Sequence, residues 1–293
     1  MLKKFKYNII DKIKFYSSYL FYKFLVLFET KKPKFKLFIL NIFYSFINLI
    51  HLLNKSEKLS KFFYEISTVD YVETIFGRFF VRRNTIDSII ASPCFERGDV
   101  NFLIKRISEE IFNKKNIIFL DIGADFGYYS ILSSNIFKNN KLLKIYSFEP
   151  TSKSRFLLEK NIELNNAKNI KVFPFAIYKE SDQNISIKIE EKATGSNSIS
   201  LDIQNSEVEV VKTRTIDSVL INEINNFDTV FIKIDIEGFE TEALIGAKTI
   251  LKSNKKIYLM VEDFVNDRII DFLENTNATF IGKFNNYNSW WKF

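Results

Sequence analysis

One stretch near the middle of the chain restricts the possible folds more than any other. The apolar run Ile117–Leu120 ends in Asp121, and two glycines follow, Gly123 and Gly127. An uninterrupted apolar run is typical of a parallel strand buried on both faces. Glycine allows a tight turn and a close approach to a ligand, and the N-terminus of a following helix points its amide groups at that ligand. The stretch predicts the first strand, loop and helix of a nucleotide-binding type of α/β domain.

The loop itself narrows the type of ligand. It reads Gly-Ala-Asp-Phe-Gly and lacks the full G-x-G-x-x-G of the dinucleotide fold. Phe126 is large where a pyrophosphate would need close approach. An acid at the strand end, Asp121, suits a cationic or amine-bearing ligand better than a phosphate.

After this loop, the pattern alternates between strand and helix. We expect strands at 144–149, 169–177, 228–235 and 256–262, helices at 152–165 and 240–251, and final strands at 279–284 and 289–293 that are candidates for antiparallel pairing. Repeated βα units imply a Rossmann-like, doubly wound, mostly parallel sheet. The insert 181–212 departs from this pattern, and its alternating segments predict a hairpin that forms a flap over the site.

The basic charge is concentrated at the N-terminus. Residues 1–66 hold 13 lysines and 4 acidic residues, a net charge of about +9, whereas the whole chain carries +7. We therefore predict a basic, aromatic-rich helical extension over 1–66 and a Rossmann-like α/β domain over 67–293, with its core at 100–293.

The partner of this extension is left open by the sequence. The stretch 37–53 is apolar and uncharged, near the lower length limit for a membrane span. Three interpretations compete: a helical hairpin packed on the domain or on a second subunit, a basic amphipathic surface on anionic lipid, or a true span. No small-residue cleavage site follows an early apolar segment, so we do not predict a signal peptide. No recognition motif supports nucleic acid, so we predict no nucleic-acid partner.

Cysteine and histidine are nearly absent. The single Cys94 excludes a disulfide framework and a cysteine zinc site, and it fits a reducing compartment. The single His51 is far from the glycine loop, which argues against a histidine triad.

Three predicted strands end in acids, namely Asp121, Glu149 and Asp235. Doubly wound sheets bind ligands at the carboxyl ends of their strands, near the point where strand order reverses. Glu149 lies 22 positions after Gly127, the distance at which a carboxylate accepts hydrogen bonds from ribose hydroxyls. The alternative is a solvated loop acid.

The strand before Asp235 is charged on one face. Lys233, Asp235 and Glu237 alternate with isoleucines, so strand geometry puts all three on the same side. Charges on a central strand are costly unless paired, and a Lys233–Asp235 pair would offset that cost. The alternative interpretations are an ion pair that seals a helix N-terminus, and capping of the next helix by Glu237 and Glu240.

Three segments together resemble the FkbM family of S-adenosylmethionine-dependent methyltransferases. They are Asp121–Ser130, Phe148-Glu149-Pro150 and Ile234–Glu240, and the resemblance covers roughly residues 75–265. Family members often carry Asn where this chain has Asp125. The resemblance implies a seven-stranded methyltransferase sheet and S-adenosyl-L-methionine as cofactor. The cofactor contacts that it implies come from Asp121, Gly123, Ala124, Gly127, Tyr128, Glu149, Pro150 and Ala176.

Methyl transfer to a hydroxyl needs alignment and a base. Because no histidine is near, the base must be a carboxylate or a lysine. Our hypothesis is that Asp235 or Glu237 removes the hydroxyl proton, with Lys233 orienting the acid. A divalent metal on Asp235, Glu237 and Glu262 or Asp263 has no strict ligand spacing behind it, and we predict none.

The predicted function is O-methylation of a hydroxyl of a sugar in a bacterial cell-surface polysaccharide or glycolipid. We expect a cytoplasmic protein, with contact to the inner face of the membrane through residues 1–66 as one option. The sequence leaves N-methylation and oligomerisation open.

One alternative function is that of an NAD(P)-dependent oxidoreductase, against which the missing third glycine and the Asp-x-Glu-Gly-x-Glu segment argue. Another is a non-catalytic membrane-associated scaffold of the same fold.

Overall fold

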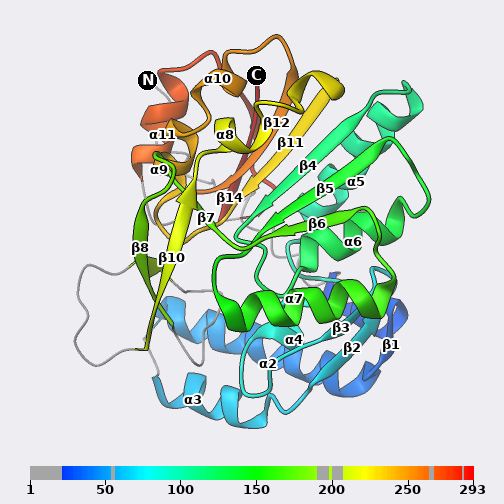
Figure 1. The fold of residues 1–293 in the computed structure, drawn as a ribbon. Helices are drawn as coiled ribbons and strands as arrows, with labels where there is room; N and C mark the ends of the chain where they lie inside the picture. Colours follow the sequence, from blue (N-terminus) through cyan, green and yellow to red (C-terminus); the bar gives the residue numbers. More distant parts are fainter. Residues whose placement is uncertain (1–21, 54–56, 190–197, 200–206, 264–266, 286) are drawn as a thin grey trace. The chain divides into compact units, whose positions relative to one another are not determined.

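The computed structural model describes residues 22–53, 57–189, 198–199, 207–263, 267–285 and 287–293. The chain forms two compact units, Met1–Arg97 and Gly98–Phe293 (Figure 1).

The second unit is built on a seven-stranded sheet. Its strand order is β13-β14-β12-β11-β4-β5-β6. The five strands from β12 to β6 are parallel, and β14 is antiparallel to both β12 and β13. This confirms the predicted mostly parallel, doubly wound sheet and its antiparallel final strands. The strands are β4 (Ile117–Ile122), β5 (Leu143–Phe148), β6 (Ile170–Phe173), β11 (Thr229–Ile234), β12 (Lys256–Glu262), β13 (Thr279–Gly282) and β14 (Asn288–Lys292).

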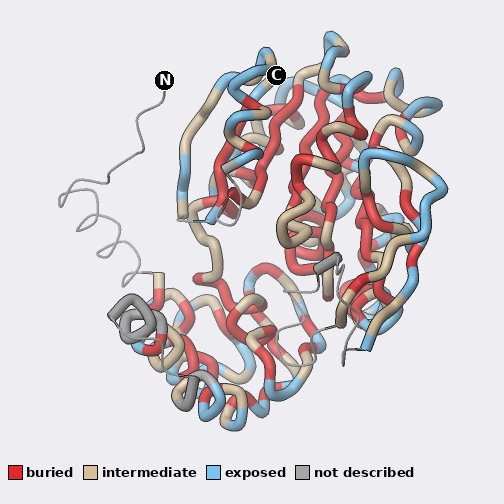
Figure 2. The backbone as a smooth tube through the Cα atoms, turned by 90° about the vertical axis from the view of Figure 1, so that its left-hand side faces the viewer, coloured by how far each residue is buried: buried red, intermediate tan, exposed pale blue. Residues whose placement is uncertain are grey.

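Strand order reverses at β4. From β4 the chain proceeds to β5 and β6 on one side, and later to β11 and β12 on the other. Every residue of β4 and β11 is buried, and Figure 2 shows the sheet as the buried centre of this unit. The carboxyl ends of β4, β5 and β11 therefore surround the position where doubly wound folds bind ligands.

Helices cover both faces of the sheet. Isoleucines and leucines of β4, β11 and β12 pack on one face against Leu220, Leu244, Ile250 and Leu273 from the helices α8 to α11. On the other face α5 places Phe102 against Trp290. The helices of this unit are α5 (Arg97–Phe112, beginning at the boundary), α6 (Tyr128–Ile136), α7 (Ser152–Asn165), α8 (Ile216–Leu220), α9 (Glu240–Ile245), α10 (Lys248–Leu251) and α11 (Asp267–Glu274), with a 3-10 turn η2 (Ile224–Asn226).

The predicted strand 169–177 is interrupted in the structure. β6 ends at Phe173, and β7 (Ala176–Ile177) leaves the main sheet to pair with β10 (Val208–Arg214). Pro174 lies at the break, and proline has no N–H to donate to a strand ladder. β10 also pairs antiparallel with β8 (Asn184–Lys188), which confirms the predicted hairpin in the insert. The short β9 (Ser198–Ile199) completes a second sheet of order β7-β10-β8-β9.

The predicted helix 240–251 is also split. It divides into α9 and α10 around Gly246, where a Cβ atom would lie 2.3 Å from the carbonyl oxygen of Tyr178. The helix is therefore interrupted at the point where the backbone of Gly246 lies close to that of Tyr178.

The first unit combines helices with a small sheet. Residues 22–29 are helical, and the part of the predicted helical extension that precedes them lies outside the described residues. α2 and α3 pack together through Phe43, Tyr44 and Phe63. The elements are β1 (Thr30–Lys32), α2 (Lys34–Leu53), α3 (Glu57–Ile66), β2 (Tyr71–Thr74), β3 (Arg78–Phe80) and α4 (Asp87–Ile90).

The boundary between the units differs from the predicted one after residue 66. β2 and β3, beyond that boundary, form a sheet with β1, which precedes α2. The segment 67–97 therefore belongs with the first unit. In the part of the chain that the structure describes, none of the helices combines the length and apolarity needed to cross a membrane.

Candidate active site

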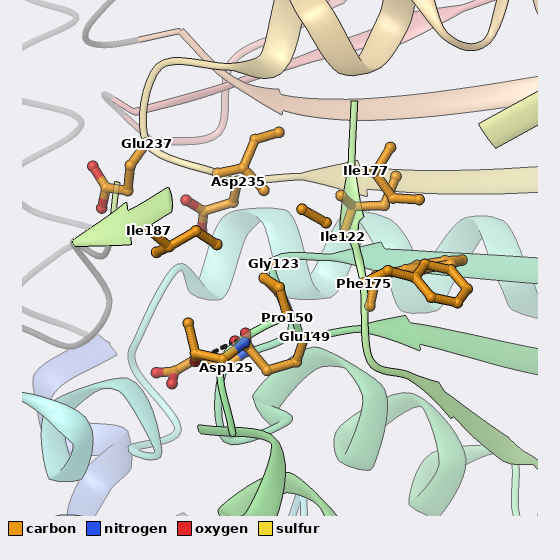
Figure 3. Close-up of a pocket in the computed structure, with 14 residues that line it drawn as sticks. Ile122, Gly123, Asp125, Glu149, Pro150, Phe175, Ile177, Ile187, Asp235 and Glu237 are labelled. Atoms are coloured by element: carbon orange, nitrogen blue, oxygen red, sulfur yellow. Dashed lines mark hydrogen bonds between the residues drawn. The ribbon is translucent and has the colours of Figure 1, made fainter. Parts of the chain in front are cut away.

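A pocket lies at the carboxyl ends of the central strands (Figure 3). Gly123, which follows β4, lies between two sets of side chains. Asp125 and Glu149 are on one side, and Asp235 and Glu237, which follow β11, are on the other. The pocket is thus where the reversal of strand order predicts a ligand.

The two glycines of the loop are required by close packing. Gly123 has φ of +77°, and a Cβ there would lie 1.9 Å from the carbonyl oxygen of Asp235. Gly127 has φ of +93°, and a Cβ there would lie 2.4 Å from Leu158 of α7. Asn161 of α7 donates a hydrogen bond of 2.9 Å to the carbonyl of Phe126. The loop is therefore fixed against β11 on one side and α7 on the other.

Glu149 is buried and well bonded. Its Oε1 accepts hydrogen bonds from the Thr151 N–H at 2.9 Å and the Thr151 hydroxyl at 2.6 Å, and its Oε2 accepts one from the Asp125 N–H at 3.0 Å. Burial, and then the Asp125 carboxylate, raise the pKa of Glu149 to about 7. A carboxylate has about four acceptor positions, so the protein leaves one on Oε2 for a ligand that donates.

Apolar side chains line the pocket together with Glu149. They include Phe148, Phe175 and Ile177, and Phe148 is stacked on Phe173 with ring centroids 4.9 Å apart. A flat apolar wall next to a carboxylate with a vacant acceptor position fits an adenosine, whose ring is flat and whose ribose donates hydrogen bonds. The residues present therefore fit the cofactor that the sequence predicts.

A buried chain of polar groups connects the two sides below the pocket. The Ser130 hydroxyl donates to Asp121 at 2.6 Å and lies 2.7 Å from the Ser147 hydroxyl. The other Asp121 oxygen is 3.8 Å from Nζ of Lys233, which in turn donates to Asp235 at 3.2 Å. Burial raises the pKa of Asp121, and Lys233 opposes that rise. Lys233 is therefore a buried cation held between two carboxylates.

Three carboxylates meet on the β11 side. Asp235, Glu237 and Glu262 each offer an oxygen, and these oxygens all lie within 4.8 Å of one another. Burial, and then the charges of Asp235 and Glu237, raise the pKa of Glu262 to about 9. At neutral pH a proton on Glu262 reduces the repulsion. The same oxygens could hold a divalent cation. The sequence shows no distinctive spacing for this set of ligands, because Glu262 ends β12 whereas Asp235 and Glu237 follow β11.

Glu240 holds the loop that carries this cluster. It is buried at the start of α9, and its Oε1 accepts hydrogen bonds from the N–H groups of Ile236 at 3.2 Å and Gly238 at 3.0 Å. These N–H groups belong to the loop before α9, so the two hydrogen bonds hold the loop and do not cap the helix. Glu237, the other candidate for capping, lines the pocket.

The structure separates the predicted residues into two groups. Those that line the pocket are Gly123, Glu149, Pro150, Ala176, Asp235 and Glu237. Those that do not are Asp121, Ala124, Gly127, Tyr128 and Lys233, all in or directly below the loop and strands that shape it.

Eight lining residues are outside the predicted set, namely Ile122, Asp125, Phe148, Thr151, Phe175, Ile177, Ile187 and Ile236. Thr151 directly follows Pro150 and precedes the predicted helix 152–165. This position at the end of a strand and the start of a helix could have identified Thr151 as a site residue. Ile187 comes from β8, and its presence agrees with an insert that reaches the site. Nothing in the alternating sequence of the insert distinguishes Ile187 from its neighbours.

The fold and the site together define a Rossmann-like methyltransferase. The chain belongs to the FkbM methyltransferase domain family, whose model matches residues 121–280, more than half of the chain. It is therefore an S-adenosyl-L-methionine-dependent methyltransferase. No curated protein matches the chain in sequence.

Similar solved structures are distant. Fibrillarin of Aeropyrum pernix, with natively bound S-adenosyl-L-methionine, is 9% identical over 61% of this chain and 65% of that one, with a TM-score of 0.36. A SAM-dependent methyltransferase from Aquifex aeolicus is 13% identical over 64% and 88%, with a TM-score of 0.37. Precorrin-6y C5,15-methyltransferase from Geobacter metallireducens is 14% identical over 61% and 79%, with a TM-score of 0.34.

Proposed function

We propose that the protein transfers a methyl group to a hydroxyl of a sugar in a bacterial cell-surface polysaccharide or glycolipid. Bound S-adenosyl-L-methionine supplies the methyl group on a sulfonium. On the chain's side, the Glu149 half of the pocket binds the nucleoside, and the Asp235 half receives the acceptor. The observation that carries the proposal is the position of Asp235, which is partly exposed in the pocket beside Gly123 and bonded to a buried lysine.

Asp235 is the proposed general base. Its side chain is 37% exposed, so an acceptor hydroxyl can reach it, whereas Lys233 behind it is 6% exposed. The hydrogen bond from Lys233 orients the carboxylate. The acceptor hydroxyl gives its proton to Asp235 as its oxygen becomes the nucleophile. Glu237 lines the same pocket and is the proposed second contact for the acceptor.

The charge around Asp235 favours a neutral polyhydroxyl acceptor. Asp235, Glu237 and Glu262 supply acceptor oxygens within a small space. Carboxylates accept hydrogen bonds from hydroxyls and repel phosphate or carboxylate groups. A neutral sugar ring with several hydroxyls satisfies this set without adding negative charge. We further propose that this sugar is part of a glycan assembled on the cytoplasmic side of the membrane, and that the enzyme acts there.

The test is methyl transfer to a panel of neutral glycosides, each paired with its amino and deoxy analogues. We expect a mass gain of one methylene on a hydroxyl glycoside, and no gain when that hydroxyl is replaced by hydrogen. Transfer only to the amino analogues would replace O-methylation with N-methylation. Binding of S-adenosylhomocysteine without transfer to any glycoside would contradict the sugar assignment and leave the methyltransferase class intact.

A further inference from the structure

The first unit exposes a line of large apolar side chains along α2. Phe35 is 73% exposed and Ile39 is 63% exposed, and Ile42 and Phe46 follow. Positions 35, 39, 42 and 46 lie within about 60° of one another around a helix axis. These side chains therefore form one continuous stripe.

The opposite side of α2 is buried in its own unit. Leu37, Leu40 and Ile47 are at most 3% exposed and lie on the far side of the helix from the stripe. The sequence has no charged residue between Lys36 and Lys55. A helix that is apolar all round needs an apolar environment on both sides, and the residues of this unit that the structure describes cover only one side.

Neighbouring helices extend the stripe on both sides. The ring of Phe24, in the helical residues 22–29, is 6.0 Å from that of Phe38 of α2. The ring of Phe62 of α3 is 5.9 Å from that of Phe43 of α2. We call the resulting surface the apolar face. It comprises seven exposed residues, Phe24, Phe28, Phe35, Ile39, Ile42, Phe46 and Phe62.

Exposed lysines lie at one end of the apolar face and on the neighbouring helix α3. Lys31, Lys32, Lys34 and Lys36 are exposed where α2 begins, and Lys61 is exposed on α3. Lys31 pairs with Glu73, and Lys36 donates to the Thr68 hydroxyl. Residues 1–66 as a whole hold 13 lysines against 4 acidic residues. Large exposed apolar patches mark interaction sites, and lysines beside exposed phenylalanines favour an anionic lipid surface as the partner.

We propose that the apolar face docks on the surface of a bilayer that contains anionic lipids. The phenylalanine and isoleucine side chains enter the boundary between headgroups and acyl chains, and the lysines lie at the lipid phosphates. α2 then lies in the plane of the membrane, with its buried side still packed on its own unit. The proposal does not depend on the acceptor of the methyl group.

The test is co-sedimentation of the full chain with vesicles of phosphatidylcholine alone or with about one third phosphatidylglycerol. We expect binding to the anionic vesicles that weakens at high salt. Phe35→Ser/Ile39→Ser should lower the partition coefficient at least tenfold, and Lys32→Gln/Lys34→Gln should lower it less. The matched control is Phe112→Ser/Phe156→Ser, which removes two exposed phenylalanines of the second unit, and it should bind like the parent chain.

Hydrogen exchange and light scattering test the same proposal independently of vesicle co-sedimentation. Hydrogen exchange of the parent chain should show slower exchange at residues 35–46 when anionic vesicles are added, which requires no variant to fold. Light scattering reports whether Phe35→Ser/Ile39→Ser converts a dimer to a monomer. Absence of vesicle binding, equal binding by this variant and the control, or such a conversion would overturn the proposal, the last by assigning the face to a second copy of the chain.

Discussion

The two sides of the pocket use carboxylates in opposite ways. Glu149 is 6% exposed and accepts three hydrogen bonds from the protein, so it is fixed and has one acceptor position left. Asp235 is 37% exposed and is bonded to a buried lysine, with two other acids nearby. A fixed acid with one vacant position suits ligand binding, whereas an exposed acid beside a cation suits proton transfer. Substitutions on the two sides should therefore affect different steps.

The largest effect is expected where the two sides meet. Gly123→Ala places a Cβ 1.9 Å from the Asp235 carbonyl oxygen at a φ of +77°, so the loop and β11 must separate. We expect binding of S-adenosylhomocysteine to be lost and the free energy of unfolding to fall by more than about 3 kcal/mol. Calorimetric titration measures the binding, and thermal unfolding measures the loss of stability.

A second glycine separates crowding from backbone strain. Gly238 has φ of +99°, but a Cβ there meets no atom within 4 Å. Gly238→Ala should cost only about 1–2 kcal/mol and retain ligand binding. Equal damage from both substitutions would show that the close approach at Gly123 is not what shapes the pocket.

The second effect is on turnover. Asp235→Asn keeps the size of the side chain and removes the proposed base, so kcat should fall about 10²–10⁴-fold. The dissociation constant for S-adenosylhomocysteine should stay within about threefold, because the nucleoside side is untouched. Asp271→Asn on α11, an exposed position, is the matched control and should leave both values unchanged. Full turnover by Asp235→Asn would remove this residue from the mechanism.

The third effect is on binding. Glu149→Ala removes a carboxylate that accepts from ribose, and hydrogen bonds to charged groups contribute about 1.5–3 kcal/mol. Calorimetry should give a dissociation constant for S-adenosylhomocysteine that is about 10–150-fold higher. Glu159→Ala, an exposed glutamate of α7, should bind normally. Unchanged affinity in Glu149→Ala would place the nucleoside elsewhere.

The fourth effect is a pH dependence of that binding. The pKa of Glu149 in the free protein is about 7, and ribose hydroxyls bind the ionised form better. Binding therefore lowers this pKa and releases a proton, so affinity should rise by about tenfold from pH 6 to pH 8. Titrations at three pH values measure this, with Glu149→Gln as the variant that should lack the dependence. A constant affinity in the parent chain would contradict the assignment.

The smallest effect is on stability at alkaline pH. The pKa of Glu262 is about 9 when folded and near 4.5 when unfolded, so the folded state holds a proton that unfolding releases between these values. Stability from this group is therefore lost as pH rises through that window. Glu262→Gln should melt higher than the parent chain, and the gap should widen by a few degrees from pH 6 to pH 8.5. If the difference in melting temperature narrows instead, Glu262 is ionised at neutral pH, which is the state expected when the carboxylates bind a cation.

Much of this arrangement was predictable from the sequence. Buried apolar runs predict β4, β11 and β12, and acids at the ends of such strands predict which side chains share an edge. The alternation of Lys233 and Asp235 with isoleucines predicted their pairing, which the structure confirms at 3.2 Å.

Other features depend on contacts distant in sequence. Glu262 joins Asp235 only because β12 lies next to β11. The N–H of Asp125 reaches Glu149 only because the loop folds over β5. The boundary at residue 97 follows from the pairing of β1 with β2 across two helices. No local pattern in the sequence encodes these neighbours.

The most direct test of the two-sided site is one calorimetric series with S-adenosylhomocysteine and three proteins: the parent chain, Glu149→Ala and Asp235→Asn. The account predicts normal affinity in Asp235→Asn and an affinity lowered at least tenfold in Glu149→Ala. Equal weakening of both variants, or weakening of Asp235→Asn alone, would contradict the division of the pocket into a binding side and a reacting side.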